Sequence, residues 1–119
     1  MILDAGVFIA LDNPSQRGVV VALVEKMLAE EVVPATTDAV LAQAWRNPAI
    51  QVPMGRLVKA VDVYPFGDPK AVGLRCAQSG TDDVVDASLA VLGDQLDRVI
   101  LTTDPADMAR LGARHVALG

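Results

Sequence analysis

Short apolar runs alternate with longer stretches of helical periodicity along this chain. Five runs have the length and apolar content of β-strands: residues 1–3, 32–36, 62–66, 99–103 and 115–118. Between them, apolar residues recur every three or four positions, as they do on one face of a helix. Strands that alternate with helices are typical of an α/β protein with right-handed crossovers between parallel strands. We therefore expect a parallel sheet covered by helices.

Residues that begin and end helices stand at the borders of these periodic stretches. Helices are predicted at roughly residues 5–11, 16–31, 38–45, 51–61, 69–78, 84–96 and 105–111. Ser15 is a candidate N-cap for the second of them, and Asn47-Pro48 a candidate break after the third. The apolar stripe of the second helix is predicted to face the core, and it consists of Val20, Leu23, Val24, Met27 and Leu28.

The composition favours a sheet that is buried on both faces. The chain has 119 residues, which suits one domain over residues 1–119, and 52% of them are hydrophobic. Only 3% are aromatic, so the core must be built from Val, Leu, Ile and Ala. The same scarcity argues against a single-strand binder that stacks bases on aromatic rings.

Charge and reactive side chains narrow the classes of function. The net charge of −5 argues against a broad basic surface that binds nucleic acid, so any contact with nucleic acid must be local or bridged by metal. A lone cysteine, Cys76, rules out an internal disulfide and a thiolate zinc site. A Ser-His-Asp mechanism would depend on His115 alone. With no leader pattern and no apolar run that could span a bilayer, we expect a cytoplasmic protein without a membrane partner.

Four aspartates stand where such a fold would bring them together. Asp4 closes the first strand, Asp83 and Asp86 begin the helix at 84–96, and Asp104 follows the strand at 99–103. The carboxyl ends of neighbouring parallel strands share one rim of a sheet, where open α/β sheets bind ligands. Carboxylates this close repel one another unless a hard divalent cation lies between them. The pattern indicates a Mg²⁺ or Mn²⁺ site.

Each aspartate also has an ordinary structural explanation. Asp104 before a proline, and Asp83 before Val84, are typical helix N-caps. Asp86 is harder to explain in this way because its neighbours are apolar, and Asp4 interrupts two apolar runs without a nearby Lys or Arg. Capping is the better explanation for any one position, but four independent caps need not converge on one rim, so together they favour a metal site.

Four segments in order carry a family resemblance: residues 2–11, 40–46, 81–87 and 102–105. Their order and spacing resemble the PIN-domain family, and most closely its small VapC-like toxins. The resemblance implies a three-layer α/β/α sandwich with a central parallel sheet and a Mg²⁺- or Mn²⁺-dependent endoribonuclease. It implies Asp4, Asp86 and Asp104 as metal ligands, with Asp83 as an additional acid. It further implies an RNA substrate, an antitoxin partner and a homodimer.

The chain departs from the family pattern at two positions. Gln43 stands where members of the family commonly have a glutamate, and Gly6 where most have Ser, Thr or Asn. Two further side chains are candidate accessory residues. Arg46 either donates hydrogen bonds to a phosphate at the rim or is a solvated side chain. Thr103 either orients Asp104 or contacts a phosphate, unless it is simply a strand residue.

Three other classes remain to be weighed. A catalytically weak or inactive PIN-like module that binds RNA or protein is favoured by the lost charge at Gln43. A phosphotransfer receiver domain needs a lysine near the end of a late strand, and residues 99–103 contain none. A phosphatase of the haloacid dehalogenase type needs a second acid two residues after Asp4, where this chain has Gly6.

Overall fold

A parallel sheet forms the centre of the computed structural model, which describes residues 1–47 and 51–118. Within these residues the sheet has five strands, in the order β3-β2-β1-β4-β5, and every pairing is parallel. The strands are β1 (Ile2–Leu3), β2 (Ala35–Thr37), β3 (Asp62–Tyr64), β4 (Ile100–Thr102) and β5 (His115–Ala117). The first strand pairs with the strand near residue 100, the condition on which the convergence of Asp4 and Asp104 depended, since Ile2 pairs with Ile100 and Leu3 with Leu101.

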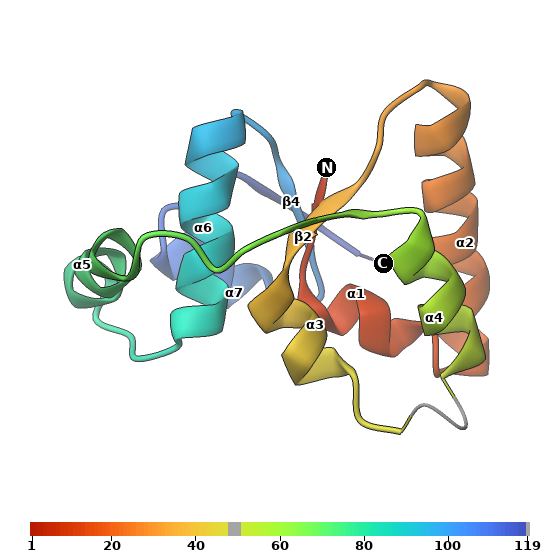
Figure 1. The fold of residues 1–119 in the computed structure, drawn as a ribbon, viewed down its shortest axis with the longest axis horizontal. Helices are drawn as coiled ribbons and strands as arrows, with labels where there is room; N and C mark the ends of the chain where they lie inside the picture. Colours follow the sequence, from red (N-terminus) through yellow and green to blue (C-terminus); the bar gives the residue numbers. More distant parts are fainter. Residues whose placement is uncertain (48–50, 119) are drawn as a thin grey trace.

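Helices cover both faces of this sheet. They are α1 (Ala5–Ala10), α2 (Pro14–Ala29), α3 (Asp38–Ala44), α4 (Val52–Lys59), α5 (Pro69–Ser79), α6 (Val84–Leu96) and α7 (Pro105–Arg110). Figure 1 shows α1, α2 and α4 on one side of the strands and α5, α6 and α7 on the other. The predicted α/β/α sandwich with a parallel sheet is confirmed. None of the described helices is both long and apolar enough to cross a bilayer.

The central strand is the most deeply buried element. Both residues of β1, Ile2 and Leu3, are fully buried, as are Ala35 of β2 and Ile100 of β4. Helices on both faces therefore remove the middle of the sheet from water, and the small and branched side chains of the strands fill the space between the layers. Any polar group at the end of β1 consequently enters a strongly desolvated environment.

The order of the strands reverses between β1 and β4. From β1 the chain moves outward through β2 to β3, and then returns to the other side of β1 to form β4 and β5. In open α/β sheets, ligands bind at such a switch point, outside the carboxyl ends of the strands. This order differs from the 2-1-3-4-5 order of receiver domains, which removes that alternative. The ends of β1 and β4 lead into α1 and α7, at Asp4 and Asp104.

Local capping follows the sequence signals, with one exception. Thr37, Asp68, Asp83 and Asp104 are N-caps of α3, α5, α6 and α7, and for Asp83 and Asp104 the sequence predicted this role. The prediction of Ser15 as the cap of α2 is wrong. Asn13 takes that role, and its Oδ1 accepts a hydrogen bond from the Ser15 backbone N–H at 3.1 Å. The side chain of Asn13 reaches N–H groups that an N-cap two residues later would leave open.

One apolar residue of the predicted core stripe also lies differently from the expectation. Leu28 was predicted to face the core, but it is 43% exposed, whereas Val20, Val24 and Met27 are buried. Eight residues after Val20, Leu28 points about 80° away from the buried stripe around the helix axis. Trp45, just beyond α3, is 42% exposed and does not belong to the core. The predicted break at Pro48 lies outside the described residues.

Candidate active site

Asp4 is a buried carboxylate at the point where β1 becomes α1. It is 5% exposed. Its Oδ1 accepts a hydrogen bond from the Ala5 backbone N–H at 2.6 Å, and its Oδ2 accepts one from the Thr102 hydroxyl, also at 2.6 Å. Neither of the two ion pairs found in residues 1–47 and 51–118 involves it. Burial raises the pKa of Asp4 above its ordinary value, and the charges of Asp83 and Asp104 add to this effect.

Asp83 and Asp86 come from the first turn of α6, which packs against β2 and β4. Oδ1 of Asp83 accepts hydrogen bonds from the backbone N–H groups of Val85 and Asp86 at 3.1 and 3.0 Å. Asp86 is half-buried. Its pKa is raised to about 7, first because burial penalises the charged form, and next because Asp4 and Asp83 are close enough to repel it. The structure thus brings the acids of β1 and α6 together, as the sequence predicted.

Asp104, which follows β4 and caps α7, is the fourth aspartate of the site, and Asp107 lies three residues further on in α7. Oδ1 of Asp104 accepts from the Asp107 backbone N–H at 3.3 Å and so caps α7. The pKa of Asp107 is raised, chiefly by a side-chain hydrogen bond with Asp104. Asp107 was not among the predicted site residues, because an acid three residues after a helix N-cap is also common in ordinary helix capping. The same spacing also places both carboxylates on one face of the first turn.

Thr102 is a second residue that sequence reasoning missed. It is fully buried at the end of β4. Its hydroxyl donates to Oδ2 of Asp4 and accepts from the backbone N–H of Asp104 at 2.9 Å. One side chain therefore joins the ends of β1 and β4. A threonine in a strand gives no sequence signal for such a role, because β-branched residues are common in strands for packing reasons.

The arrangement fits a metal ion in its chemistry, although it does not enclose one as it stands. The donors are hard carboxylate oxygens at a desolvated rim, as Mg²⁺ and Mn²⁺ prefer. Yet in residues 1–47 and 51–118 no three acidic, imidazole or thiol side chains surround a common point as ligands would. Two of the acids, Asp83 and Asp104, are occupied as helix caps instead. Binding a cation would require these side chains to turn toward Asp4.

Gly6 and Thr103 lie in unusually close contact. A Cβ atom added at Gly6 would stand 1.8 Å from Oγ1 of Thr103 and 2.9 Å from its Cβ. Cβ atoms essentially never approach another heavy atom to less than about 3.0 Å, so the side chain of Thr103 occupies the space that a side chain at position 6 would otherwise fill. In this arrangement the hydroxyl of Thr103, just after β4, leaves no room at position 6 for the polar side chain that the family resemblance implies.

The structure does not join Gln43 and Arg46 to the aspartates. Both are exposed near the end of α3, and Nε of Arg46 donates to the backbone carbonyl of Gln43 at 2.9 Å. The helix that carries Gln43 begins at the carboxyl end of β2 and packs against α1 and α6, so it flanks the same rim. A role for Gln43 or Arg46 at the site remains a prediction.

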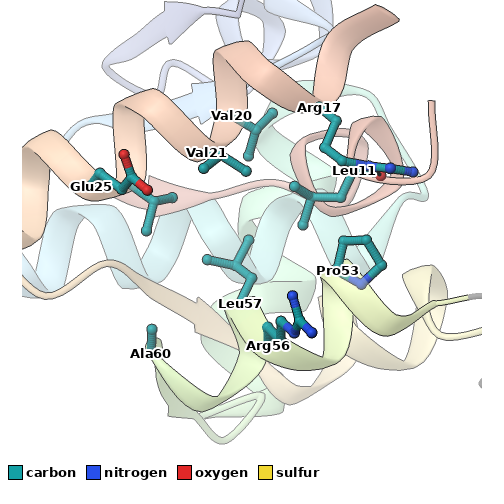
Figure 2. Close-up of a pocket in the computed structure, with 10 residues that line it drawn as sticks. Leu11, Arg17, Val20, Val21, Glu25, Pro53, Arg56, Leu57 and Ala60 are labelled. Atoms are coloured by element: carbon teal, nitrogen blue, oxygen red, sulfur yellow. Dashed lines mark hydrogen bonds between the residues drawn. The ribbon is translucent and has the colours of Figure 1, made fainter. Parts of the chain in front are cut away.

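A separate apolar pocket of about 410 Å³ lies between α2 and α4, as Figure 2 shows. Val20 and Val21 approach it from α2 and Leu57 from α4, while Arg17 and Arg56 supply charged groups at its borders. None of the four aspartates lines it. This pocket is therefore distinct from the acidic rim.

Comparison with known proteins defines the class of fold. No family model and no curated protein matches the sequence. Among solved structures, VapBC2 from Rickettsia felis bound to a DNA fragment from their promoter is 13% identical with a TM-score of 0.75, over 99% of this chain and 98% of that one. FitAB bound to the IR36 DNA fragment is 14% identical with a TM-score of 0.72, over 98% of this chain and 93% of that one. PAE2754 from Pyrobaculum aerophilum is 19% identical with a TM-score of 0.69, over 97% and 82%. At these identities the likeness shows a shared fold.

Proposed function

We propose that this protein is a PIN-like, metal-dependent endoribonuclease that hydrolyses phosphodiester bonds in RNA. The observation that carries the proposal is the convergence of Asp4, Asp83 and Asp86 with Asp104 at the switch point of the sheet. There the charges of Asp83 and Asp104 add to the raised pKa of Asp4, and those of Asp4 and Asp83 add to the raised pKa of Asp86. In this proposal Asp4, Asp86 and Asp104 hold Mg²⁺ or Mn²⁺. Asp83 completes the acidic rim.

The chemistry follows from the acids and their supports. A bound divalent cation would supply an activated water and neutralise charge on the scissile phosphate. The carboxylate of Asp4 is held in one orientation by Ala5 and Thr102, so it needs no reorganisation to serve as a ligand. Asp86, whose pKa lies near 7, retains a proton on its carboxyl in part of the molecules at neutral pH and gives it up when positive charge arrives.

A cleavage assay tests this proposal. The purified protein should cut single-stranded RNA in the presence of Mn²⁺ or Mg²⁺, and EDTA should abolish the cutting. Asp4→Asn should lower the rate at least a hundredfold, because it removes a charged oxygen ligand and keeps the shape and capping ability of the side chain. Asp68→Asn is the matched control, since Asp68 caps α5 away from the rim. Activity that survives both EDTA and Asp4→Asn would refute the site.

The biological role that we propose is the toxin of a toxin–antitoxin pair. Support comes from the sequence resemblance to VapC-like toxins and from the shared fold with the VapBC2 and FitAB structures. The partner would be an antitoxin, encoded in an adjacent open reading frame as a small DNA-binding protein with a flexible tail. The pocket between α2 and α4 offers such a tail an apolar surface beside Arg17 and Arg56. Homodimer formation and a cytoplasmic location belong to the same proposal.

Charge substitution in the pocket tests the partner. Val21→Asp places a carboxylate on the apolar wall and should abolish co-purification with the adjacent-frame product. Leu74→Asp is the matched control, because Leu74 is even more exposed, at 59% compared with 41% for Val21, and lies on α5 on the opposite side of the sheet. If both variants lose binding equally, or if neither loses it, docking at this pocket is contradicted.

The alternative is a module that binds RNA or protein with weak or absent catalysis. Gln43 favours it, because a neutral amide stands where the family resemblance implies a charged ligand. RNA binding without metal-dependent cleavage in the assay above would support this alternative.

A further inference from the structure

We propose that Thr103 is a substrate-binding residue whose hydroxyl donates a hydrogen bond to a phosphate oxygen of RNA at the acidic rim. This inference rests on the proposed ribonuclease function. Its starting point is the contact between Thr103 and Gly6, which fixes the threonine across the first turn of α1. Because residue 6 is glycine, Thr103, the residue after β4, can place its hydroxyl there. Gly6 is two residues along the chain from Asp4, and Thr103 is one residue from Asp104.

The hydroxyl of Thr103 has the properties of a group that is open to a ligand. The side chain is exposed, whereas the neighbouring Thr102 is fully buried and uses its own hydroxyl to join Asp4 to Asp104. Within the part of the chain that the structure describes, no hydrogen bond engages the Thr103 hydroxyl. The two adjacent threonines thus differ: Thr102 is buried and bonded to the carboxylate of Asp4, whereas Thr103 belongs to the exposed surface and holds its hydroxyl over Gly6.

A phosphate is the ligand that this donor suits. The aspartates of the rim can only accept hydrogen bonds when they are ionised, so a phosphate next to them needs a donor from another residue. A lysine or arginine in the place of Thr103 would pair with the carboxylates and oppose cation binding. A neutral hydroxyl donates to a phosphate oxygen without adding charge, and a donor to an anion makes a stronger bond than a neutral pair does.

Removal of the hydroxyl at constant shape tests the proposed hydrogen bond. Thr103→Val keeps the branched side chain over Gly6 and should lower kcat/KM for single-stranded RNA with Mn²⁺ about ten- to a hundredfold, the factor expected for a bond to a charged group. The melting temperature and the calorimetric Kd for Mn²⁺ should stay at the wild-type values, as a merely structural role would not allow. Thr103→Ser restores the hydroxyl and should recover most of the loss.

A second pair of variants tests the contact without any activity measurement. Gly6→Ala should lower the melting temperature, because its Cβ collides with Thr103. In a Thr103→Gly background the same change should raise it, since alanine is the better helix former and the obstacle is gone. A change of the same sign in both backgrounds would overturn the geometry on which the inference rests.

The outcomes separate this inference from the proposed function. If the wild type cleaves RNA and Thr103→Val has the same kcat/KM, the proposed ribonuclease function stands and the proposed role of Thr103 is overturned. A loss in Thr103→Ser as large as in Thr103→Val would also overturn it, because the methyl group and not the hydroxyl would then matter. An inactive wild type would refute the proposed function, and the inference with it.

Discussion

At the scale of single residues, the two carboxylates Asp4 and Asp86 show that the site places charged groups where burial is unfavourable to them. Asp4 and Asp86 both have raised pKa values, and in both cases burial is the first cause. Hydrogen bonds from Thr102 and Ala5 offset part of this cost for Asp4. The amino-acid pattern revealed these residues because an aspartate among apolar neighbours is unusual. It did not reveal the donors, because a backbone N–H and a strand threonine occur everywhere.

The raised pKa of Asp86 predicts a pH dependence of stability. An ordinary aspartate in the unfolded chain has a pKa of about 3.9, whereas Asp86 in the folded protein has one of about 7. Between these values the folded state holds more protons, so the stability of the metal-free protein should fall as pH rises from about 4 to about 7. At pH 8 the free energy of unfolding of Asp86→Asn should therefore exceed that of the wild type. The difference should be on the order of 1 kcal/mol, since partial exposure of the carboxyl and screening by salt reduce the effect.

Urea unfolding at pH 5 and pH 8 in EDTA measures this difference. The advantage of Asp86→Asn over the wild type should be smaller at pH 5, where the wild-type carboxyl is mostly protonated in the folded state. Equal differences at the two pH values would mean that the carboxyl of Asp86 titrates normally.

Gln43 supports a second prediction at this scale. Gln43→Glu should tighten Mn²⁺ binding by a few-fold and speed up RNA cleavage, because hard cations gain from a charged oxygen ligand. In the metal-free protein it should raise the pKa of a neighbouring carboxylate and lower stability slightly. Gln78→Glu, an exposed position on α5, is the matched control. Calorimetric Mn²⁺ affinities that agree among all three proteins would place Gln43 outside the site.

At the scale of elements, the ends of β1 and β4 position Asp4 and Asp104, and the start of α6 positions Asp83 and Asp86. All the elements were predicted from periodicity and capping signals, and their ends moved by three residues at most. The strand predicted at 32–36 is β2 at Ala35–Thr37, and the helix predicted at 16–31 is α2 at Pro14–Ala29. Ends shift because caps depend on which side chain reaches a free N–H group, as Asn13 rather than Ser15 does at α2.

Thr102 allows the β1–β4 junction to be tested. Thr102→Val keeps the shape of the strand residue but leaves Oδ2 of Asp4 and the backbone N–H of Asp104 without their partner. The cost should be about 1–3 kcal/mol, because buried polar groups lose a hydrogen bond that water cannot replace. Since the Thr102 hydroxyl lowers the pKa of Asp4, that pKa should rise further in the variant. Chemical denaturation measures the cost.

Thr103→Val is the matched control for this experiment. It makes the same chemical change one residue further on, at an exposed hydroxyl, and should alter stability by less than about 0.5 kcal/mol. A similar small effect for Thr102→Val would show that the bridge between the strands contributes little.

At the scale of the whole molecule, the sheet order explains why acids distant in sequence meet. The alternation of strands and helices predicted a parallel sheet, but not that β1 and β4 are neighbours at a reversal of strand order. That adjacency brings Asp4 close to residues about a hundred positions later, as the bond between Asp4 and Thr102 shows. The contact between Gly6 and Thr103 was equally hidden, because it depends on the packing of α1 against β4.

The account as a whole requires that a cation binds among these acids and relieves their repulsion. No three ligand side chains among the described residues enclose a common point, so binding must reorganise the rim. Thermal melts with EDTA and with Mn²⁺, on the wild type, Asp86→Asn and the control Asp68→Asn, measure this most directly. We predict that Mn²⁺ at a hundredfold excess over Kd stabilises the wild type and Asp68→Asn by about 2.7 kcal/mol, and Asp86→Asn far less. No shift for the wild type, or an equal shift for Asp86→Asn, would contradict a metal site at the switch point.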